Sequence, residues 1–380
     1  MPTMKDGIAA HEQHRGRLRV QTASPYFSGT YPEARTKFLE AARRAGARIN
    51  HHEHPLKGPE GEVLATDVAR IGPADASRIL AIGSGTHGVE GYCGSGVQTA
   101  LLSGGFADEL PDGTALVLVH AINPYGFAWN RRVNEDNVDL NRNFIDHSKP
   151  HPENPGYEEL ADAINPRDLS PETMAKSRAR MKAYAERHGH RAMQHALSAG
   201  QYTHADGVQF GGREPVWSNR TLRKIIREEM AQASRVIFVD IHTGLGARGQ
   251  GEMICVEPET SETYKRMRRW WGDIVHSTVG GASVSSDVPG SIPVCFAEEL
   301  KGREVTSGGL EFGTVPIAQV TIALQSDNWL HQNGGAENPR AKEIAKAIRD
   351  AFYVDADDWK EMVTAQTRDI CRAALKGLQE

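Results

Sequence analysis

The sequence predicts an α/β protein in which helices cover a mixed, mostly parallel sheet. Short, continuous apolar runs of the kind found in buried strands alternate with helical patterns over most of the chain. The 380 residues are enough to bury a large core, and 38 glycines allow many tight turns between elements. These observations favour one layered architecture over a helical bundle or an all-β fold.

Each expected element rests on a local pattern. A helix is expected over 31–47, where apolar residues recur at helical spacing and Gly46 ends the pattern. The apolar runs at 78–82 and 115–120 predict buried strands on either side of a helix over 91–102. The later expected elements are strands at 235–241, 309–313 and 317–324 and helices at 261–279, 340–352 and 357–378.

The stretch 146–217 breaks this alternation. It begins with a Pro-rich loop, continues through a polar helix around 170–198 and ends in a glycine-rich loop. No linker separates it from the rest of the chain. We therefore expect one domain over 1–380, with 146–217 as a helical and loop insertion over the active-site face.

Composition argues against several function classes. The formal net charge is −5, and no Lys/Arg run is long enough to follow a phosphate backbone, so no nucleic-acid partner is expected. No apolar run reaches the length of a membrane span, and the N-terminus lacks the apolar core of a secretory signal. Four scattered cysteines indicate reduced, buried thiols. We expect a cytoplasmic protein that does not bind membranes.

His87-Gly-Val-Glu90 is the first candidate for metal chemistry. It places an imidazole and a carboxylate three residues apart, directly after the apolar run 79–82, with glycines on both sides. A catalytic zinc needs three protein ligands and one open position, and this loop offers two of them. The spacing alone is weak, because a loop histidine and a solvated glutamate would look the same.

Two later segments carry further polar groups. Arg131-Arg132 and Asn141-Arg142 follow the strand that ends at His120, on the sheet edge where open α/β sheets bind ligands. Asn141 and Arg142 present an amide and a forked guanidinium, which are suited to gripping a carboxylate. The alternative is a structural ion pair between Arg142 and Asp136 or Asp139.

The last two candidates lie on strands. In Asp240-Ile-His242-Thr-Gly, residues two apart face the same way, so Asp240 is a candidate partner for the imidazole of His242. Glu311 stands among apolar residues and glycines, where an acid is costly to bury unless it is paired or catalytic. For Glu311 alone, a solvent-facing position on an edge strand is an equal alternative.

Taken in this order, His87-x-x-Glu90, Asn141-Arg142, His242 and Glu311 resemble the motifs of the zinc carboxypeptidases related to carboxypeptidase A. The aspartoacylase and succinylglutamate desuccinylase deacylases share that scaffold. From about Tyr31 onward, the chain looks like a bacterial branch of this superfamily. The resemblance implies a three-layer αβα fold.

The resemblance also implies a role for each residue. His87, Glu90 and His242 would bind one Zn²⁺ per chain, and Glu311 would be the general base and then the general acid. Asn141 and Arg142 would hold the free carboxylate of the substrate. Of Arg131 and Arg132, we assign Arg132 to the scissile carbonyl and leave Arg131 to substrate binding. The implied activity is a metallocarboxypeptidase-type amide hydrolysis on a small peptide or an N-acyl amino acid.

Departures from the family pattern leave alternatives open. The digestive enzymes carry a substrate-capping tyrosine ahead of the catalytic glutamate, whereas no tyrosine lies between Tyr264 and Tyr353 here. This absence favours an aspartoacylase-like deacylase of N-acyl amino acids or small amides. A non-catalytic binding protein on the same scaffold is the alternative of another class. A second metal ion near Glu135, Asp139 or Asp240, and assembly into a homo-oligomer, stay open.

Overall fold

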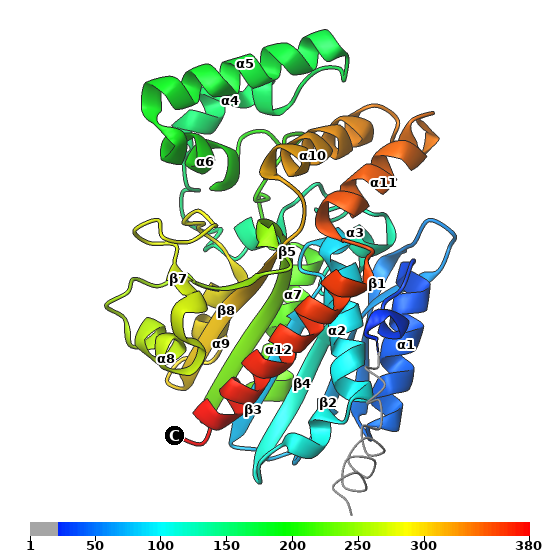
Figure 1. Cartoon of the computed structure of the whole chain (residues 1–380), viewed down its shortest axis with the longest axis vertical. Helices are drawn as coiled ribbons and strands as arrows, with labels where there is room; N and C mark the ends of the chain where they lie inside the picture. Colours follow the sequence, from blue (N-terminus) through cyan, green and yellow to red (C-terminus); the bar gives the residue numbers. More distant parts are fainter. Residues whose placement is uncertain (1–21) are drawn as a thin grey trace, which may run out of the picture.

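A computed structural model describes residues 22–380 and shows one eight-stranded sheet in the order β1-β2-β4-β3-β5-β8-β6-β7 (Figure 1). The strands are β1 (Arg48–Lys57), β2 (Val63–Ile71), β3 (Arg78–Ser84), β4 (Thr114–His120), β5 (Arg235–Arg248), β6 (Gly251–Cys255), β7 (Val275–Ser277) and β8 (Glu304–Gly313). The pairs β3–β4, β3–β5, β5–β8 and β6–β7 are parallel, and the other pairs are antiparallel. The expected α/β class with a mixed sheet is confirmed.

Helices cover both faces of this sheet. The helices are α1 (Tyr31–Arg44), α2 (Gly91–Ser103), α3 (Pro124–Ala128), α4 (Pro155–Ile164), α5 (Pro171–His188), α6 (His190–Ser198), α7 (Trp217–Met230), α8 (Glu262–Trp271), α9 (Ile292–Glu299), α10 (Ile317–Gln332), α11 (Ala341–Phe352) and α12 (Asp357–Gly377). Apolar residues of α1, α2, α8 and α12 form one core cluster, and those of α7 and α9 form a second.

The central strands supply both clusters because their side chains alternate between the two faces. Leu80 and Ile82 of β3 belong to the cluster under α2 and α12, whereas Ile79 and Ala81 belong to the cluster under α7 and α9. All four residues are at most 1 % exposed. A strand buried on both faces reads as a continuous apolar run, and this is why β3, β4 and β5 are visible in the sequence.

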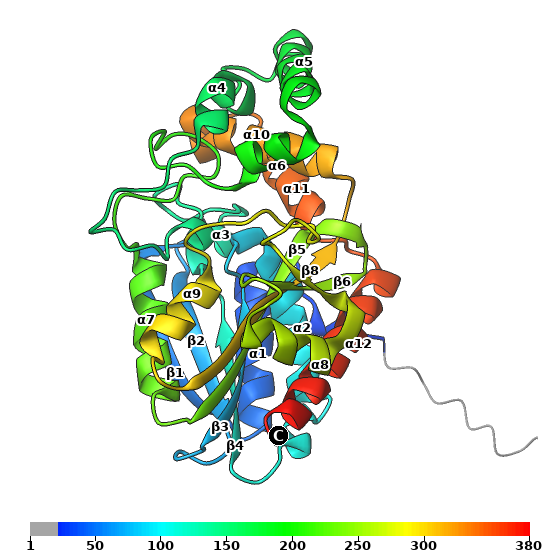
Figure 2. The same cartoon turned by 90° about the vertical axis from the view of Figure 1, so that its left-hand side faces the viewer.

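The segment 146–217 forms a separate layer beyond the carboxyl ends of the strands (Figures 1 and 2). Its helices α4, α5 and α6 pack on one another through a small cluster that includes Tyr157, Leu160 and Tyr184. The helix expected around 170–198 is two helices, because the chain turns at Gly189, where φ is +90°. A residue without a Cβ adopts this conformation at little steric cost.

Two expectations about secondary structure were wrong, and some strands were missed. The run 317–324 predicts a strand because it is rich in β-branched residues, but it forms the first half of α10, which buries Val320, Ala323 and Asp327 at helical spacing. The helix expected over 261–279 ends at Trp271 and gives way to β7. Strands β1 and β2 were missed; β1 is a largely exposed edge strand whose polar sequence shows no apolar run.

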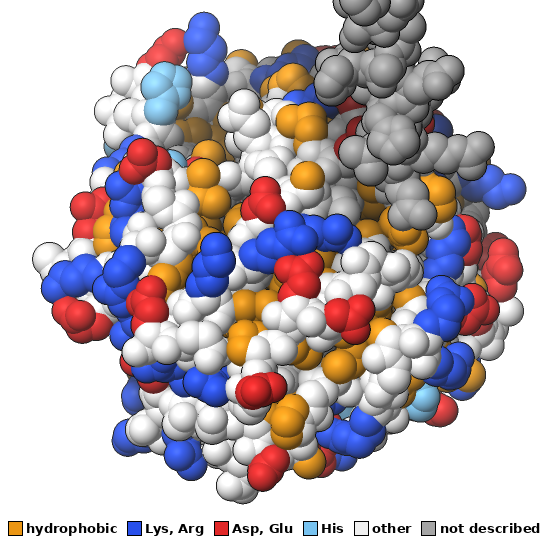
Figure 3. All heavy atoms as spheres, turned by 60° about the horizontal axis from the view of Figure 1, so that its bottom comes forward, with side chains coloured by type: hydrophobic (Ala, Val, Ile, Leu, Met, Phe, Trp, Pro, Cys, Tyr) orange, Lys and Arg blue, Asp and Glu red, His pale blue; other side chains and the backbone are white. Residues whose placement is uncertain are grey.

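No helix among residues 22–380 is both long and apolar enough to cross a bilayer. On the face shown in Figure 3, basic and acidic side chains are interspersed, and neither sign forms a broad patch there. The prediction that the N-terminus lacks a secretory signal concerns residues outside the described part of the chain.

His120, at the end of β4, is a buried histidine whose titration makes the stability of the fold depend on pH. Its ring is stacked on Phe38 with centroids 4.4 Å apart, and its Nε2 lies 2.9 Å from Ser95 Oγ. Burial lowers the pKa of His120 to about 4. The unfolded chain, with a histidine pKa of about 6.5, binds this proton more readily, so the group destabilises the fold by up to about 3 kcal/mol as pH falls from 6.5 to 4.

We therefore expect His120→Gln to flatten the fall in unfolding free energy between pH 7 and 4. Urea unfolding at a series of pH values measures this slope. His195→Gln, which changes an exposed histidine of α6, is the control and should keep the wild-type slope. Equal slopes for wild type and His120→Gln would show that His120 is not the group that titrates.

Candidate metal centre

The candidate residues meet at the carboxyl edge of the four mutually parallel strands β4, β3, β5 and β8. His87 lies three residues beyond the end of β3, and His242 lies within β5. Glu311 is the register partner of His242 on β8, so these two side chains stand next to each other on neighbouring strands. The loop after β4 brings in the arginines and Asn141.

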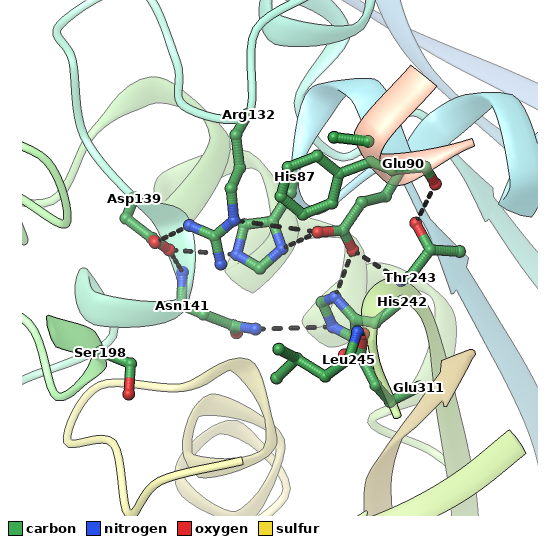
Figure 4. A network of polar contacts seen from close by, with 12 residues as sticks. His87, Glu90, Arg132, Asp139, Asn141, Ser198, His242, Thr243, Leu245 and Glu311 are labelled. Carbon is green, nitrogen blue, oxygen red and sulfur yellow. Dashed lines mark hydrogen bonds and ion pairs between the residues drawn. The ribbon is translucent and has the colours of Figure 1, made fainter. Parts of the chain in front are cut away.

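The carboxylate of Glu90 lies between two imidazoles (Figure 4). His87 Nδ1 is 2.8 Å from Glu90 Oε1, and His242 Nδ1 is 2.9 Å from Glu90 Oε2. Within residues 22–380, these three side chains are the one His/Cys/Asp/Glu group whose ligand atoms all lie within 4.8 Å of one another. All three are at most 5 % exposed.

The second nitrogen of each imidazole also faces a carboxylate. His87 Nε2 lies 3.1 Å from Asp139, and His242 Nε2 lies 2.7 Å from Asp240. With Nε2 donating to an aspartate, each imidazole in its neutral form would offer the lone pair of its Nδ1 to a bound cation. Two such nitrogens and a carboxylate are the donor set of a catalytic zinc site, and the buried residues fit that ion.

Charges near the ligands are balanced. Although burial opposes it, the nearby His87 and His242 hold the pKa of Glu90 well below its usual value. Arg132, then Arg142 and His87, do the same for the pKa of Asp139. Both carboxylates therefore stay ionised, which is the form that binds a cation or orients an imidazole.

A tight backbone contact ties the His87 loop to the arginine segment. Gly88 N donates to Arg132 O and Val89 N donates to Arg131 O, both at 3.0 Å. A Cβ on Gly88 would lie 2.0 Å from the carbonyl carbon of Gly126, so only glycine allows this approach. The loop that carries two candidate ligands is therefore held in register with the two arginines.

The two arginines point in different directions. Arg132 lines the cavity, forms an ion pair with Asp139 and reaches within 3.9 Å of Glu90. Arg131 bonds to Asn137 and pairs with Asp327 of α10 at 3.4 Å, and it does not line the cavity. The arrangement places Arg132 beside the ligands and gives Arg131 a position in the scaffold.

Asn141 and Arg142 lie on the floor of the same cavity. Asn141 Oδ1 accepts from Ile292 N at 3.0 Å, and its amide nitrogen lies 3.5 Å from His242 Nε2. Arg142 donates to Asp139 at 3.3 Å and to the carbonyl of Ser198 at 2.5 Å, while its buried Nε has no partner. The ion pair with Asp139 that was the alternative for Arg142 is therefore present, and Arg142 also faces the cavity.

Glu311 is buried, with 7 % exposure, on the interior strand β8. Its Oε1 accepts from Leu245 N at 2.9 Å. Burial, and then the charge of Glu90, raise the pKa of Glu311 to about 8. The solvent-facing edge position considered for this residue is excluded, and its carboxyl can exchange a proton near neutral pH.

Sequence reasoning missed several contributors. Asp139 was considered as an ion-pair partner or a site for a second metal, but it holds His87 and two arginines together. Gln209 accepts from Arg132, and the amide of Leu245 orients Glu311. Of these residues, only Asp139 could have been recognised from the sequence, because it lies two residues before Asn141.

Comparisons with known proteins identify the family. The model of a family described as "Protein of unknown function (DUF2817)" matches residues 27–366. The chain belongs to the DUF2817 family. No curated protein sequence matches this DUF2817 protein.

The fold of this DUF2817 protein is similar to that of solved carboxypeptidase-like structures. Bovine thrombin-activatable fibrinolysis inhibitor, in complex with tick carboxypeptidase inhibitor, matches with a TM-score of 0.50 and 9 % identity over 94 % of this chain and 99 % of that chain. A putative carboxypeptidase A from Shewanella denitrificans matches with a TM-score of 0.47 and 13 % identity, over 92 % of this chain and 70 % of that chain. An aspartoacylase family protein from Mesorhizobium loti matches with a TM-score of 0.37 and 15 % identity, over 77 % of this chain and 68 % of that chain.

We expect the purified DUF2817 protein to hold about one zinc ion per chain and to lose it when His87 or His242 is changed to alanine. Asp139→Asn and Asp240→Asn should weaken zinc binding about 10- to 100-fold, because each aspartate orients a ligand. Elemental analysis and chelator competition measure both effects. Asp327→Asn is the control: Asp327 is also buried but pairs with Arg131. Unchanged affinity in both aspartate variants would contradict the assigned ligands.

Gly88→Ala should lower zinc affinity and thermal stability together, since its methyl group would displace the backbone at Gly126. Gly29→Ala is the control, because a Cβ at Gly29 meets nothing closer than 3.8 Å. Calorimetric melting with and without zinc separates the two effects. A variant that binds zinc and melts like wild type would show that the contact is not needed.

Proposed function

We propose that this protein is a zinc-dependent hydrolase that cleaves an amide bond next to a free carboxylate. The observation that carries the proposal is the meeting, in one cavity, of a His-Glu-His donor set, the buried acid Glu311 and the cations Arg132 and Arg142. The bovine protein of similar fold is bound to a carboxypeptidase inhibitor, which agrees with this reaction class.

When bound, zinc supplies a Lewis acid that polarises a carbonyl and makes water a better nucleophile at neutral pH. The ligands for it would be His87, Glu90 and His242, with Asp139 and Asp240 fixing the imidazoles. The protein supplies the proton transfers itself.

Glu311 is the proposed general base and acid. Its Oε1 is fixed by the amide of Leu245, and its position beside His242 places the carboxyl at the ligand set. It would take a proton from the attacking water and deliver it to the leaving amine. A group poised near the working pH performs both transfers well, and typical gains are about 10²- to 10⁴-fold.

Two arginines complete the proposed site. Arg132 would stabilise the negative charge that develops on the carbonyl oxygen, and Asp139 and Gln209 hold its guanidinium in place. Asn141 and Arg142 would bind the substrate carboxylate, because both residues line the cavity.

The second candidate function is a deacylase. The cavity favours it over a peptidase that acts on long chains. Helices α4 and α6 contribute Ile164, Met193 and Leu197 to its wall, so the insertion limits the room above the site. No tyrosine lines the cavity within residues 22–380. Both observations agree with an N-acyl amino acid rather than a long peptide as substrate.

Glu311→Gln is expected to lose at least about 10²-fold in kcat/KM while keeping its zinc. A panel of dipeptides and N-acyl amino acids provides the substrates, and elemental analysis checks the metal. Glu304→Gln, at the start of the same strand and paired with Arg235, is the control and should keep full activity. A zinc-loaded wild type that hydrolyses nothing in the panel would favour a non-catalytic binding protein instead.

A further inference from the structure

Resting on the proposed hydrolase function, we infer that the group on the acyl side of the scissile amide is a long aliphatic chain, held by an apolar wall that α10 and the insertion build together. The wall belongs to the cavity of about 820 Å³ that opens onto the metal centre. Its residues come from segments far apart in the sequence, so the feature is visible only in the folded chain.

The cavity lies between the loop that precedes α9 and helix α10. At one end, Asn141 accepts from Ile292 N, and a Cβ on Gly290 would lie 2.6 Å from Arg142 O. This end, beside the loop that precedes α9, is where the substrate carboxylate would bind. The other end lies against α10 and Phe352, whose ring is 2.9 Å from the position of a Cβ on Gly244.

The insertion and residues 315–324 contribute aliphatic side chains to the cavity lining. These eight residues are Ile164, Met193, Leu197, Val208, Val315, Ile317, Val320 and Leu324. Among the described residues that line the whole cavity, the charged or histidine side chains outside the metal centre and its arginines are His190 and Arg248. A wall with so few charges favours an apolar group over a polar peptide.

Buried hydrogen bonds fix the position of α10 relative to the insertion. Gln325 of α10 donates to Ala163 O at 2.8 Å, to Ile164 O at 3.3 Å and to Ser177 Oγ at 3.2 Å, and all of these contacts are buried. They fix α10 against α4 and α5. These contacts hold the aliphatic lining residues of α10 and α4 in fixed relative positions.

The wall continues to the mouth of the cavity. Ile317, at the first position of α10, is 60 % exposed and still lines the cavity. A volume of about 820 Å³ lies in the upper part of the range of ligand pockets, about 300–1,000 Å³. An acetyl or succinyl group would leave most of this surface in contact with water, whereas a long chain would cover it.

The lining also favours an aliphatic chain over an aromatic group. Phe352 is the one aromatic residue among the described lining residues, so stacking partners for a substrate ring are scarce. An unbranched chain needs only contact area, and each buried methylene contributes about a fourfold gain in affinity.

The test uses the zinc-loaded full chain and N-acyl amino acids with acyl groups of two to twelve carbons. We expect kcat/KM to rise about three- to fourfold per added methylene until the wall is covered. Blocked dipeptides with phenylalanine on the acyl side are the aromatic arm. Preference for that arm, or for the acetyl compound, would overturn the inference.

Two variants locate the effect. Leu324→Gln and Leu197→Gln change partly buried lining residues on α10 and α6, and each should flatten the dependence on chain length. Ile322→Gln is the matched control, because Ile322 is on the same helix, is 39 % exposed and does not line the cavity. A chain-length dependence that persists in both lining variants would place the acyl group elsewhere.

A binding measurement separates this inference from the proposed reaction. Calorimetry with fatty acids of four to twelve carbons needs no turnover. If nothing is hydrolysed but affinity rises with chain length and falls in Leu324→Gln, the apolar wall stands and the hydrolase proposal fails. If amides are hydrolysed without dependence on chain length, the hydrolase stands and the wall is not an acyl site.

Discussion

The site depends on keeping one carboxylate, that of Glu90, between two imidazoles, with all three side chains at most 5 % exposed. Ionised groups are expensive to bury singly, so each must be compensated by its neighbours. Asp139 and Asp240 lie behind the imidazoles, and Arg132 and Arg142 neutralise Asp139 in turn. The parallel strands make this possible, because their carboxyl ends deliver polar groups from four distant segments to one edge.

Much of the fold could be predicted where local pattern and tertiary environment agree. Strands β3, β4 and β5 are buried on both faces, so their sequences are unbroken apolar runs. Strand β1 shows no such run, because it is a largely exposed edge strand with a polar sequence. The start of α10 was mistaken for a strand, since β-branched residues favour strands on average while packing against Phe352 and Val89 selects the helix.

The ligand candidates could be proposed because His87, His242 and Glu311 each follow or belong to an apolar run. The direction in which a loop side chain points could not be predicted from the sequence. Arg131 and Arg132 are chemically identical neighbours, and only the backbone contacts of Gly88 and Val89 decide which one faces the ligands. Asp139 likewise looks like an ordinary acid until the fold brings it to His87, 52 positions away. The catalytic roles themselves stay predictions.

The bond from Arg142 to the carbonyl of Ser198 links the floor of the site to the insertion through a main-chain atom. Any residue at position 198 that keeps the helix would supply the same acceptor, whereas Gly200 beside it must stay small, since a Cβ there would meet Arg142 Cγ at 2.7 Å. Single side-chain substitutions in the insertion would therefore leave the bond to the Ser198 carbonyl in place. Replacing the insertion as a block would remove the acceptor of Arg142, so the insertion and this arginine depend on each other.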